Sequence, residues 1–361
     1  MTGSSADDRG RGGTDRDGQA DRRTDPSDPS DVDRQPDGGT ASRSDAVGSD
    51  GSDEVPDDAP SVPADVRLDT AVLRGEARLP HSRPEWEAAL DRLVRENRFT
   101  ISVVFPITGA VLLVASASGW LPPALSFNPY LVLLGVLVMR SPLIVGVLPL
   151  IGRTAAAGIA LLAAYAYGIE FVGLQTGWPY GEFEYVVDLG PTVADVPVAL
   201  PVFFLPLVMN GYLLTLLLLG DRARRAVVRL PVVVATVVVM DLVLDPGAVA
   251  LTFWTYPGGG AVYGVPLSNF AGWVLSATVA VVVLDRVFDR QGLLDRLDRC
   301  EFVLDDLVSF VLLWGAVNAW AGHWGSVLLA GAFGLGLLRT DRFDDDLLRP
   351  AWLVRLRSGT R

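Results

Sequence analysis

Long apolar runs after residue 100 constrain this chain more than any other feature of its sequence. A helix needs roughly 20 apolar residues to cross a bilayer. Runs that reach or approach this length lie near 101–120, 129–150, 154–172, 197–219, 228–245, 264–284, 302–317 and 320–338. The last two are short and also fit a re-entrant pair. The pattern predicts an all-α fold, a polytopic transmembrane helical bundle with about eight spans.

The first part of the chain has the opposite composition. Residues 1–65 are rich in Asp, Gly, Ser, Arg and Pro and contain almost no aliphatic side chains. Such a segment cannot bury enough surface to offset its ordering entropy, so we expect a disordered acidic tail. The expected parts are this tail, a linker with an interfacial amphipathic helix at 66–100, a transmembrane helical domain at 101–340 and a cytoplasmic tail at 341–361.

The linker contains one amphipathic pattern, between Ser82 and Asn97. Ser82 can serve as the N-cap and Glu85 as its partner in a capping box. Apolar side chains fall on one face and arginines flank it, so we expect this helix to lie on the membrane surface before the first span.

Charge and composition narrow the possible classes of partner. The net charge is −12, and all 30 basic residues are arginines. An acidic chain without lysine is typical of a high-salt cytoplasm, although a GC-rich genome has a similar effect. The acidic balance argues against binding to nucleic acid. The single cysteine, Cys300, allows no internal disulfide, and with only two histidines a zinc site of the usual type is not expected.

Arginines occur in every second connection between the predicted spans. They precede the first span, lie between the second and third, the fourth and fifth, and the sixth and seventh, and follow the last. The connections without arginine are 121–128, 173–196, 246–263 and 318–319. By the positive-inside rule, this alternation predicts a multi-pass protein of the cell membrane with an even number of spans and both termini cytoplasmic.

Acidic residues within the spans are costly and therefore informative. Glu170 closes the third predicted span, and Asp241 and Asp245 lie four residues apart on one face at the end of the fifth. All three fall at the non-cytoplasmic end, where the long arginine-free loops also lie. The candidate pocket residues on this side are Tyr180, Tyr185, Trp254, Tyr256, Tyr263, Asn269 and Trp273.

Each of these residues also has a structural interpretation. Trp and Tyr at span ends are often interface anchors. Asp245 precedes Pro246 and could end a helix at the water boundary, whereas Asp241, about one turn deeper, is harder to explain by solvation. We expect His323 to be an exposed polar residue. Arg140, followed by Ser141-Pro142, is expected to bond a helix-end carbonyl or to anchor a kink or break.

A family resemblance rests on motifs spread over roughly residues 100–340. They are Glu170, Thr176-Gly177-x-Pro179-Tyr180-Gly181-x-Phe183-x-Tyr185, Val196-Pro197, Asp241-x3-Asp245-Pro246, Trp254 and Tyr263-Gly264-Val265-Pro266-x2-Asn269-Phe270-x-Gly272-Trp273. This set resembles the carotenoid hydratase family, and the last motif is its most specific part. The resemblance implies cofactor-free addition of water to a terminal C=C bond of a C50 carotenoid in a haloarchaeon.

A mechanism for such a reaction can be written from general chemistry. Protonation of the alkene gives a tertiary cation, which water then traps, so the protein must supply a buried acid and a sheltered pocket. We expect Asp241 to be the general acid, with Asp245 or Glu170 relaying protons or orienting water. Trp254, Tyr256 and Trp273 would line the cation pocket, and Asn269 would hold the water.

Two other classes of function remain open from the sequence. A membrane prenyltransferase would use acidic clusters to bind a magnesium diphosphate, and one Asp-x3-Asp pair is present. A non-enzymatic carotenoid binder or a transporter would use the same acids as ion sites. The expected partners are a hydrophobic carotenoid and the lipid bilayer, with other membrane enzymes of carotenoid synthesis as further candidates.

Overall fold

The computed structural model describes residues 80–340, so the tails expected at 1–65 and 341–361 and the linker residues 66–79 lie outside it. The helical fold is confirmed. The helices are α2 (Arg83–Glu96), α3 (Phe105–Ala117), α4 (Pro129–Val147), α5 (Arg153–Thr176), α6 (Leu200–Leu219), α7 (Ala226–Ala250), α8 (Leu267–Val287), α9 (Arg290–Arg299), α10 (Asp305–Ala321) and α11 (Trp324–Arg339). Short helical turns are η1 (Thr100–Val104), η2 (Leu148–Leu150) and η3 (Gly220–Arg224).

Six helical segments in the described part are long and apolar enough to cross a membrane. They are Thr100–Ala117, Pro129–Leu150, Arg153–Thr176, Leu200–Arg224, Ala226–Ala250 and Leu267–Val287. The chain is therefore a multi-pass membrane protein. The last two predicted spans correspond to α10 and α11, which have 17 and 16 residues. The count of about eight spans thus depends on whether this shorter pair also crosses the bilayer.

Helix α7 occupies the centre of the bundle and packs against α6, α8, α10 and α11. It has 25 residues and continues through Pro246 to Ala250. The sequence interpretation in which a helix ends at Asp245 is therefore wrong. The reason is that a side chain of a neighbouring helix donates to the carbonyl that the proline leaves open, as described below.

Helix α4 likewise passes through its proline without a break. Pro142 has no N–H to donate to the carbonyl of Val138, four residues earlier. The Ser141 Oγ donates to that carbonyl instead, at 2.7 Å. The neighbouring serine thus replaces the missing backbone donor, so the break expected after Arg140 does not form.

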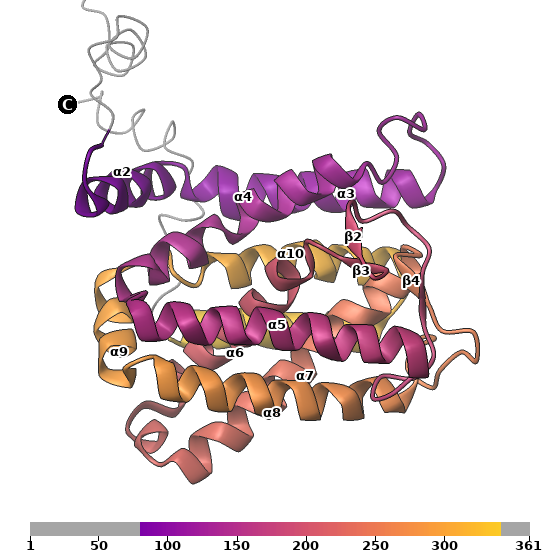
Figure 1. Ribbon diagram of the computed structural model, residues 1–361. Helices are drawn as coiled ribbons and strands as arrows, with labels where there is room; N and C mark the ends of the chain where they lie inside the picture. The colour runs from indigo at the N-terminus through magenta and orange to yellow at the C-terminus, as the bar shows by residue number, and fades with distance from the viewer. Residues whose placement is uncertain (1–79, 341–361) are drawn as a thin grey trace, which may run out of the picture. The chain divides into compact units, whose positions relative to one another are not determined.

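Two loops that are distant in the sequence pair at one end of the bundle. Strand β1 (Glu184–Tyr185) runs antiparallel to β4 (Trp254–Thr255), with Tyr185 opposite Trp254. A second short ladder joins β2 (Thr192–Val193) to β3 (Val196–Pro197). These strands lie at one end of the bundle, and α2 and α9 lie at the other (Figure 1). The arginine-free loops therefore meet at the end away from α2.

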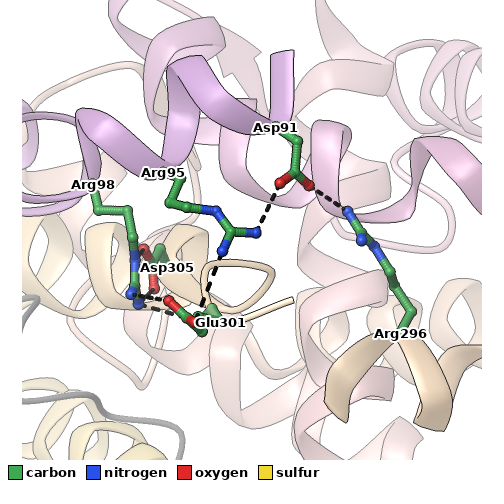
Figure 2. A network of polar contacts seen from close by, with 6 residues as sticks. All are labelled: Asp91, Arg95, Arg98, Arg296, Glu301 and Asp305. Carbon is green, nitrogen blue, oxygen red and sulfur yellow. Dashed lines mark hydrogen bonds and ion pairs between the residues drawn. The ribbon is translucent and has the colours of Figure 1, made fainter. Parts of the chain in front are cut away.

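An ion-pair network fixes α2 to the corner between α9 and α10 (Figure 2). Its members are Asp91, Arg95, Arg98, Arg296, Glu301 and Asp305. Asp91 Oδ1 and Oδ2 accept from Arg296 and Arg95 respectively, both at 2.9 Å. Burial alone would raise the pKa of the Asp91 carboxyl, but the hydrogen bonds from Arg296 and Arg95 hold it below its usual value.

The capping box that the sequence predicts at the start of α2 forms only in part. Ser82 is the N-cap residue of α2, but its side chain makes no capping bond to the backbone. Its Oγ donates to Glu85 Oε1 at 2.9 Å, and Glu85 Oε2 accepts from the His81 N–H at 2.8 Å. The reciprocal capping box is therefore incomplete. Helix α9, which the sequence pattern did not predict, buries Leu293 and Leu297 one turn apart.

A buried ion pair joins α4 to α10. The Arg140 Nη1 donates to both carboxylate oxygens of Asp306, at 2.8 and 3.0 Å. Asn210 on α6 adds a bond from Nδ2 to Asp306 Oδ2 at 2.6 Å. The interpretation of Arg140 as a helix-end or kink anchor is therefore wrong, because its guanidinium neutralises a carboxylate inside the bundle.

Candidate active site

The two aspartates of α7 form a buried acidic pair. Asp241 is 0% exposed and Asp245 is 3% exposed. Asn269, in the first turn of α8, donates from Nδ2 to Asp241 Oδ2 at 3.0 Å and also to Asp245 Oδ2. Tyr256 donates its hydroxyl to the same Asp245 oxygen at 3.3 Å. Four residues that the sequence placed on one side of the membrane thus meet in a single cluster.

No arginine forms an ion pair with this cluster within the part of the chain described. Both carboxyl groups accept from the same Asn269 Nδ2, so their Oδ2 atoms lie close together. Asp241 Oδ1 has no hydrogen-bond partner among the described side chains. The arrangement therefore suits a pair of carboxyl groups that shares one proton.

A third carboxyl group, Glu170 on α5, faces the same cavity. It accepts a hydrogen bond from the Tyr185 hydroxyl, which the β1–β4 ladder positions beside Trp254. Burial raises the pKa values of Tyr185 and Tyr256 above their usual value, so both hydroxyls remain protonated donors. Both tyrosines therefore orient carboxylate oxygens rather than taking protons from them.

Tyr180 packs closely against α8 and makes a third polar contact of the site. Its hydroxyl lies 2.6 Å from Ser276 Oγ, and Tyr165 reaches the same Oγ at 3.1 Å. Gly272 permits this approach, because a Cβ there would lie only 2.5 Å from Tyr180 Cδ1. Glycine in the Asn269-Phe270-x-Gly272-Trp273 motif therefore makes room for a ring of the site.

These groups surround a cavity of about 580 Å³ between the helices. This volume lies in the range of small-molecule sites, about 300–1,000 Å³. Most of the wall is apolar, with Leu, Phe and Trp side chains from α3, α4, α6 and α10. Of the residues predicted from sequence, the wall includes Glu170, Tyr180, Tyr185, Asp245, Trp254, Tyr256, Asn269 and Trp273. Asp241 lies behind Asp245 and does not contribute to the wall.

Burial separates the pocket tryptophans from the exposed ones. Trp120, Trp178, Trp320 and Trp324 are exposed, and each lies at a helix end on the side of the arginine-free loops. Their position is typical of interface anchors. Trp254 and Trp273 face the cavity instead, and Trp273 stacks on Phe204 with ring centroids 5.7 Å apart. The anchor interpretation therefore fits the first group and not these two.

Tyr263 is the one predicted pocket residue that lies elsewhere. It is 41% exposed, stacks on His323 at 4.2 Å between ring centroids, and accepts from the Gly325 N–H. His323, expected to be an exposed polar residue, is held by this ring and by Asn318. Tyr263 therefore packs against the α10–α11 turn, and neither residue lies at the cavity wall.

Sequence reasoning also missed residues of the site. Phe183 lies at the cavity wall and contacts the rings of Tyr180, Tyr185 and Tyr256. Its spacing of two from Tyr185 would have placed both rings on one side of a strand. Ser276 lies seven residues after Asn269, which is the helical spacing for the same face. Both could have been found from periodicity.

Metal binding finds no support in this part of the molecule. Within residues 80–340, no group of three or more His, Cys, Asp or Glu side chains is placed to hold a metal ion. The hydrogen-bond partners of the acidic pair among these residues are the Asn269 amide and the Tyr256 hydroxyl.

Comparisons with known proteins identify the family. The model of a family described as carotenoid biosynthesis protein matches residues 127–337. A bisanhydrobacterioruberin hydratase from Haloarcula japonica is 58% identical over 270 residues, which cover 74% of this chain and 92% of the relative. The relative comes from a haloarchaeon, in agreement with the acidic, lysine-free composition. No solved structure matches the chain. On the family match and this relative, the chain belongs to the carotenoid biosynthesis protein family.

Proposed function

We propose that this protein is a carotenoid hydratase that adds water to the terminal C=C bond of a C50 carotenoid, converting bisanhydrobacterioruberin to bacterioruberin. The name of the relative from Haloarcula japonica supports the substrate and the reaction. The observation that carries the proposal is the Asp241–Asp245–Asn269 cluster, in which the Asp245 carboxyl group reaches the wall of an apolar cavity within the bundle.

The acid pair would begin the reaction. A carbon–carbon double bond is a poor electrophile, so the alkene must first take a proton from a strong, positioned acid. The carboxyl proton goes to the less substituted alkene carbon, and the π electrons form the new C–H bond. Asp245 is the member of the pair at the cavity wall, so we assign the transfer to it, with Asp241 as the neighbour that shares the Asn269 amide. The product of this step is a tertiary cation and an acid pair in which both members are carboxylates.

Water would complete the reaction at the cation. Its oxygen bonds to the tertiary carbon, and the proton that it then loses returns to the acid pair, either directly or through Glu170. Atoms balance, because alkene and water give one tertiary alcohol and the acid is regenerated. Aromatic faces can stabilise a cation without reacting with it. Trp254, Tyr256 and Trp273 are the rings that we assign to this task, and Asn269 the amide that holds the water.

We further propose that both termini are cytoplasmic and that the protein lies in the cell membrane. Arginine-rich connections, α2 and α9 belong to one end of the bundle, and four of the five exposed tryptophans of the described chain belong to the other, the exception being Trp86 on α2. Cysteines introduced into the two ends of a Cys300→Ser variant should label from opposite sides. Labelling of α9 positions from outside intact cells would reject this orientation.

The direct test of the acid pair is hydration by membranes that contain the protein. Asp245→Asn keeps the size of the side chain, but its amide N–H groups are far too weakly acidic to protonate an alkene. We expect its turnover to fall by a factor of about 100 to 10,000, the usual contribution of a general acid. Turnover is measured from the mass of the product, which shows the water added to the C50 precursor. Asp241→Asn should lower turnover as well, because the shared proton is lost.

Asp188→Asn provides the matched control, since Asp188 is exposed in a loop. It should keep wild-type turnover. Full activity of Asp245→Asn with normal membrane insertion would reject the acid assignment. Pigments of a deletion strain test the reaction itself: a dehydrated C50 precursor supports hydration. A block at C40 or C45 would instead indicate prenyl transfer, and unchanged pigments would indicate binding or transport.

A further inference from the structure

The segment of α7 that carries the acid pair lacks part of its own helical hydrogen bonding. Pro246 has no N–H, so the carbonyl of Leu242 receives no bond from the backbone four residues later. Leu242 and Val243 lie between Asp241 and Asp245. An open carbonyl inside a membrane bundle costs several kcal/mol, so another group must supply the donor.

Two side chains from α10 and α11 supply donors to this turn. Ser326, 2% exposed, donates from Oγ to the Leu242 carbonyl at 2.8 Å. Asn318, 0% exposed, donates from Nδ2 to the Val243 carbonyl at 2.8 Å and to the Trp314 carbonyl of its own helix at 2.8 Å. Two of the three carbonyls between the acids are thus bonded to the α10–α11 hairpin.

The hairpin that supplies these donors is itself held in place. Asn318 uses both amide hydrogens on carbonyls, so its Oδ1 must accept, and His323 Nδ1, 3.2 Å away, must carry the hydrogen. The His323 ring stacks on Tyr263, whose hydroxyl accepts from the Gly325 N–H at 3.0 Å. This arrangement fixes the turn from which Asn318 and Ser326 approach α7.

Close packing adds a steric constraint on the same turn. A Cβ on Gly247, the residue after Pro246, would lie 2.8 Å from Trp314 Cε3 and 3.2 Å from Asn318 Nδ2. Helix α10 therefore touches the α7 backbone here without an intervening side chain. Trp314 also lies at the cavity wall, so the turn, the hairpin and the cavity share one contact region.

We infer that Asn318 and Ser326 are positioning residues, which fix the proline-opened turn of α7 and thereby the direction of the Asp241 and Asp245 carboxyl groups toward the substrate. This inference rests on the proposed function of the acid pair. Neither residue lies at the cavity wall, so neither contacts the substrate. Their loss should therefore lower the rate of the chemical step and leave substrate binding intact.

A double-mutant cycle between Ser326 and Pro246 tests this role. Ser326→Ala removes the donor, and we expect kcat to fall roughly 10- to 100-fold with KM unchanged, as for a small misplacement of a catalytic group. Pro246→Ala restores an N–H that can bond the Leu242 carbonyl. In the Pro246→Ala background, Ser326→Ala should therefore have little further effect on kcat. Equal effects of Ser326→Ala in both backgrounds would overturn the inference.

Asn318→Leu provides an independent variant with similar size and no donor, and it should show the same loss of kcat at unchanged KM. Thr278→Ala is the control, because Thr278 is exposed and its hydroxyl bonds only a carbonyl of its own helix. Rates are normalised to folded protein, so that a loss of yield alone, with normal kcat, counts against positioning. Asp245→Asn is measured in parallel. If Asp245→Asn is active, the acid pair is rejected. If it is inactive while Ser326→Ala and Asn318→Leu are fully active, only the positioning role is rejected.

Discussion

Gly272 leaves the space that the ring of Tyr180 occupies in the site. Its α-carbon faces Tyr180, and an added Cβ would also lie 3.0 Å from the Pro179 carbonyl oxygen. Overpacking of this kind costs about 1–3 kcal/mol. We therefore expect Gly272→Ala to lower the unfolding temperature in detergent and to weaken hydration, because Tyr180 must move away from Ser276. Thermal unfolding and turnover of the purified variant measure the two effects.

Gly331→Ala is the control for this prediction. Gly331 lies within α11, and a Cβ there would meet no atom within 4 Å. Alanine is preferred over glycine inside a helix by about 1 kcal/mol, so this variant should be as stable as the wild type or more stable. If Gly272→Ala and Gly331→Ala behaved alike in both measurements, the close approach of Tyr180 would have no role in the site.

At the residue scale, the sequence predicted the acidic members of the site better than their partners. Asp241, Asp245 and Glu170 stand out because carboxyl groups within apolar runs need a reason to be there. The position of Tyr263 could not be predicted, since its motif neighbour Asn269 faces the cavity while Tyr263 faces His323. That difference depends on the turn between them, which one-dimensional spacing does not describe.

At the scale of elements, the Arg140–Asp306 pair joins α4 to α10 inside the bundle. Removal of one partner of a buried ion pair leaves an uncompensated charge and typically costs about 3–5 kcal/mol. We expect Arg140→Met to lose stability on this scale, measured by thermal or denaturant unfolding in detergent. Adding Asp306→Asn should recover much of the loss, because the unpaired charge is then removed.

The exposed pair Asp295–Arg299 on α9 provides the comparison. Both side chains reach solvent, and such pairs contribute at most about 1 kcal/mol. Arg299→Met should therefore change stability far less than Arg140→Met. Equal effects of the two variants would show that burial of the Arg140 pair is not what makes it important.

Most helices were predictable as elements, but their contacts were not. Apolar length located α3 to α8, and arginine alternation separated the two ends of the bundle. Residue patterns gave no signal for the pairing of Tyr185 with Trp254, because these loops are separated by two helices. They also placed the end of a helix at Asp245, since the donors that carry α7 past Pro246 come from α10 and α11.

At the scale of the whole described molecule, the cavity has two different boundaries. Near the acid pair, the paired strands β1 and β4 cover the cavity with the side chains of Tyr185 and Trp254. Between α3 and α4, wall residues reach the outer surface of the bundle: Leu112, Leu131 and Leu134 are 49%, 52% and 58% exposed. Such exposed leucines on a spanning helix face lipid. A polyene could therefore enter from the bilayer while most of its length remains in lipid.

Gly135 allows this lateral route to be tested without disturbing the core. It lies on α4 at the cavity wall, and an added Cβ would meet no atom within 4 Å. We expect Gly135→Phe to fold normally and to lower kcat/KM for the C50 precursor, mainly through KM, because the ring narrows the opening. Gly168→Phe on α5 is matched to it, since Gly168 is also open but lies away from the cavity wall. Unchanged kcat/KM in Gly135→Phe, or an equal decrease in both variants, would mean that substrate enters elsewhere.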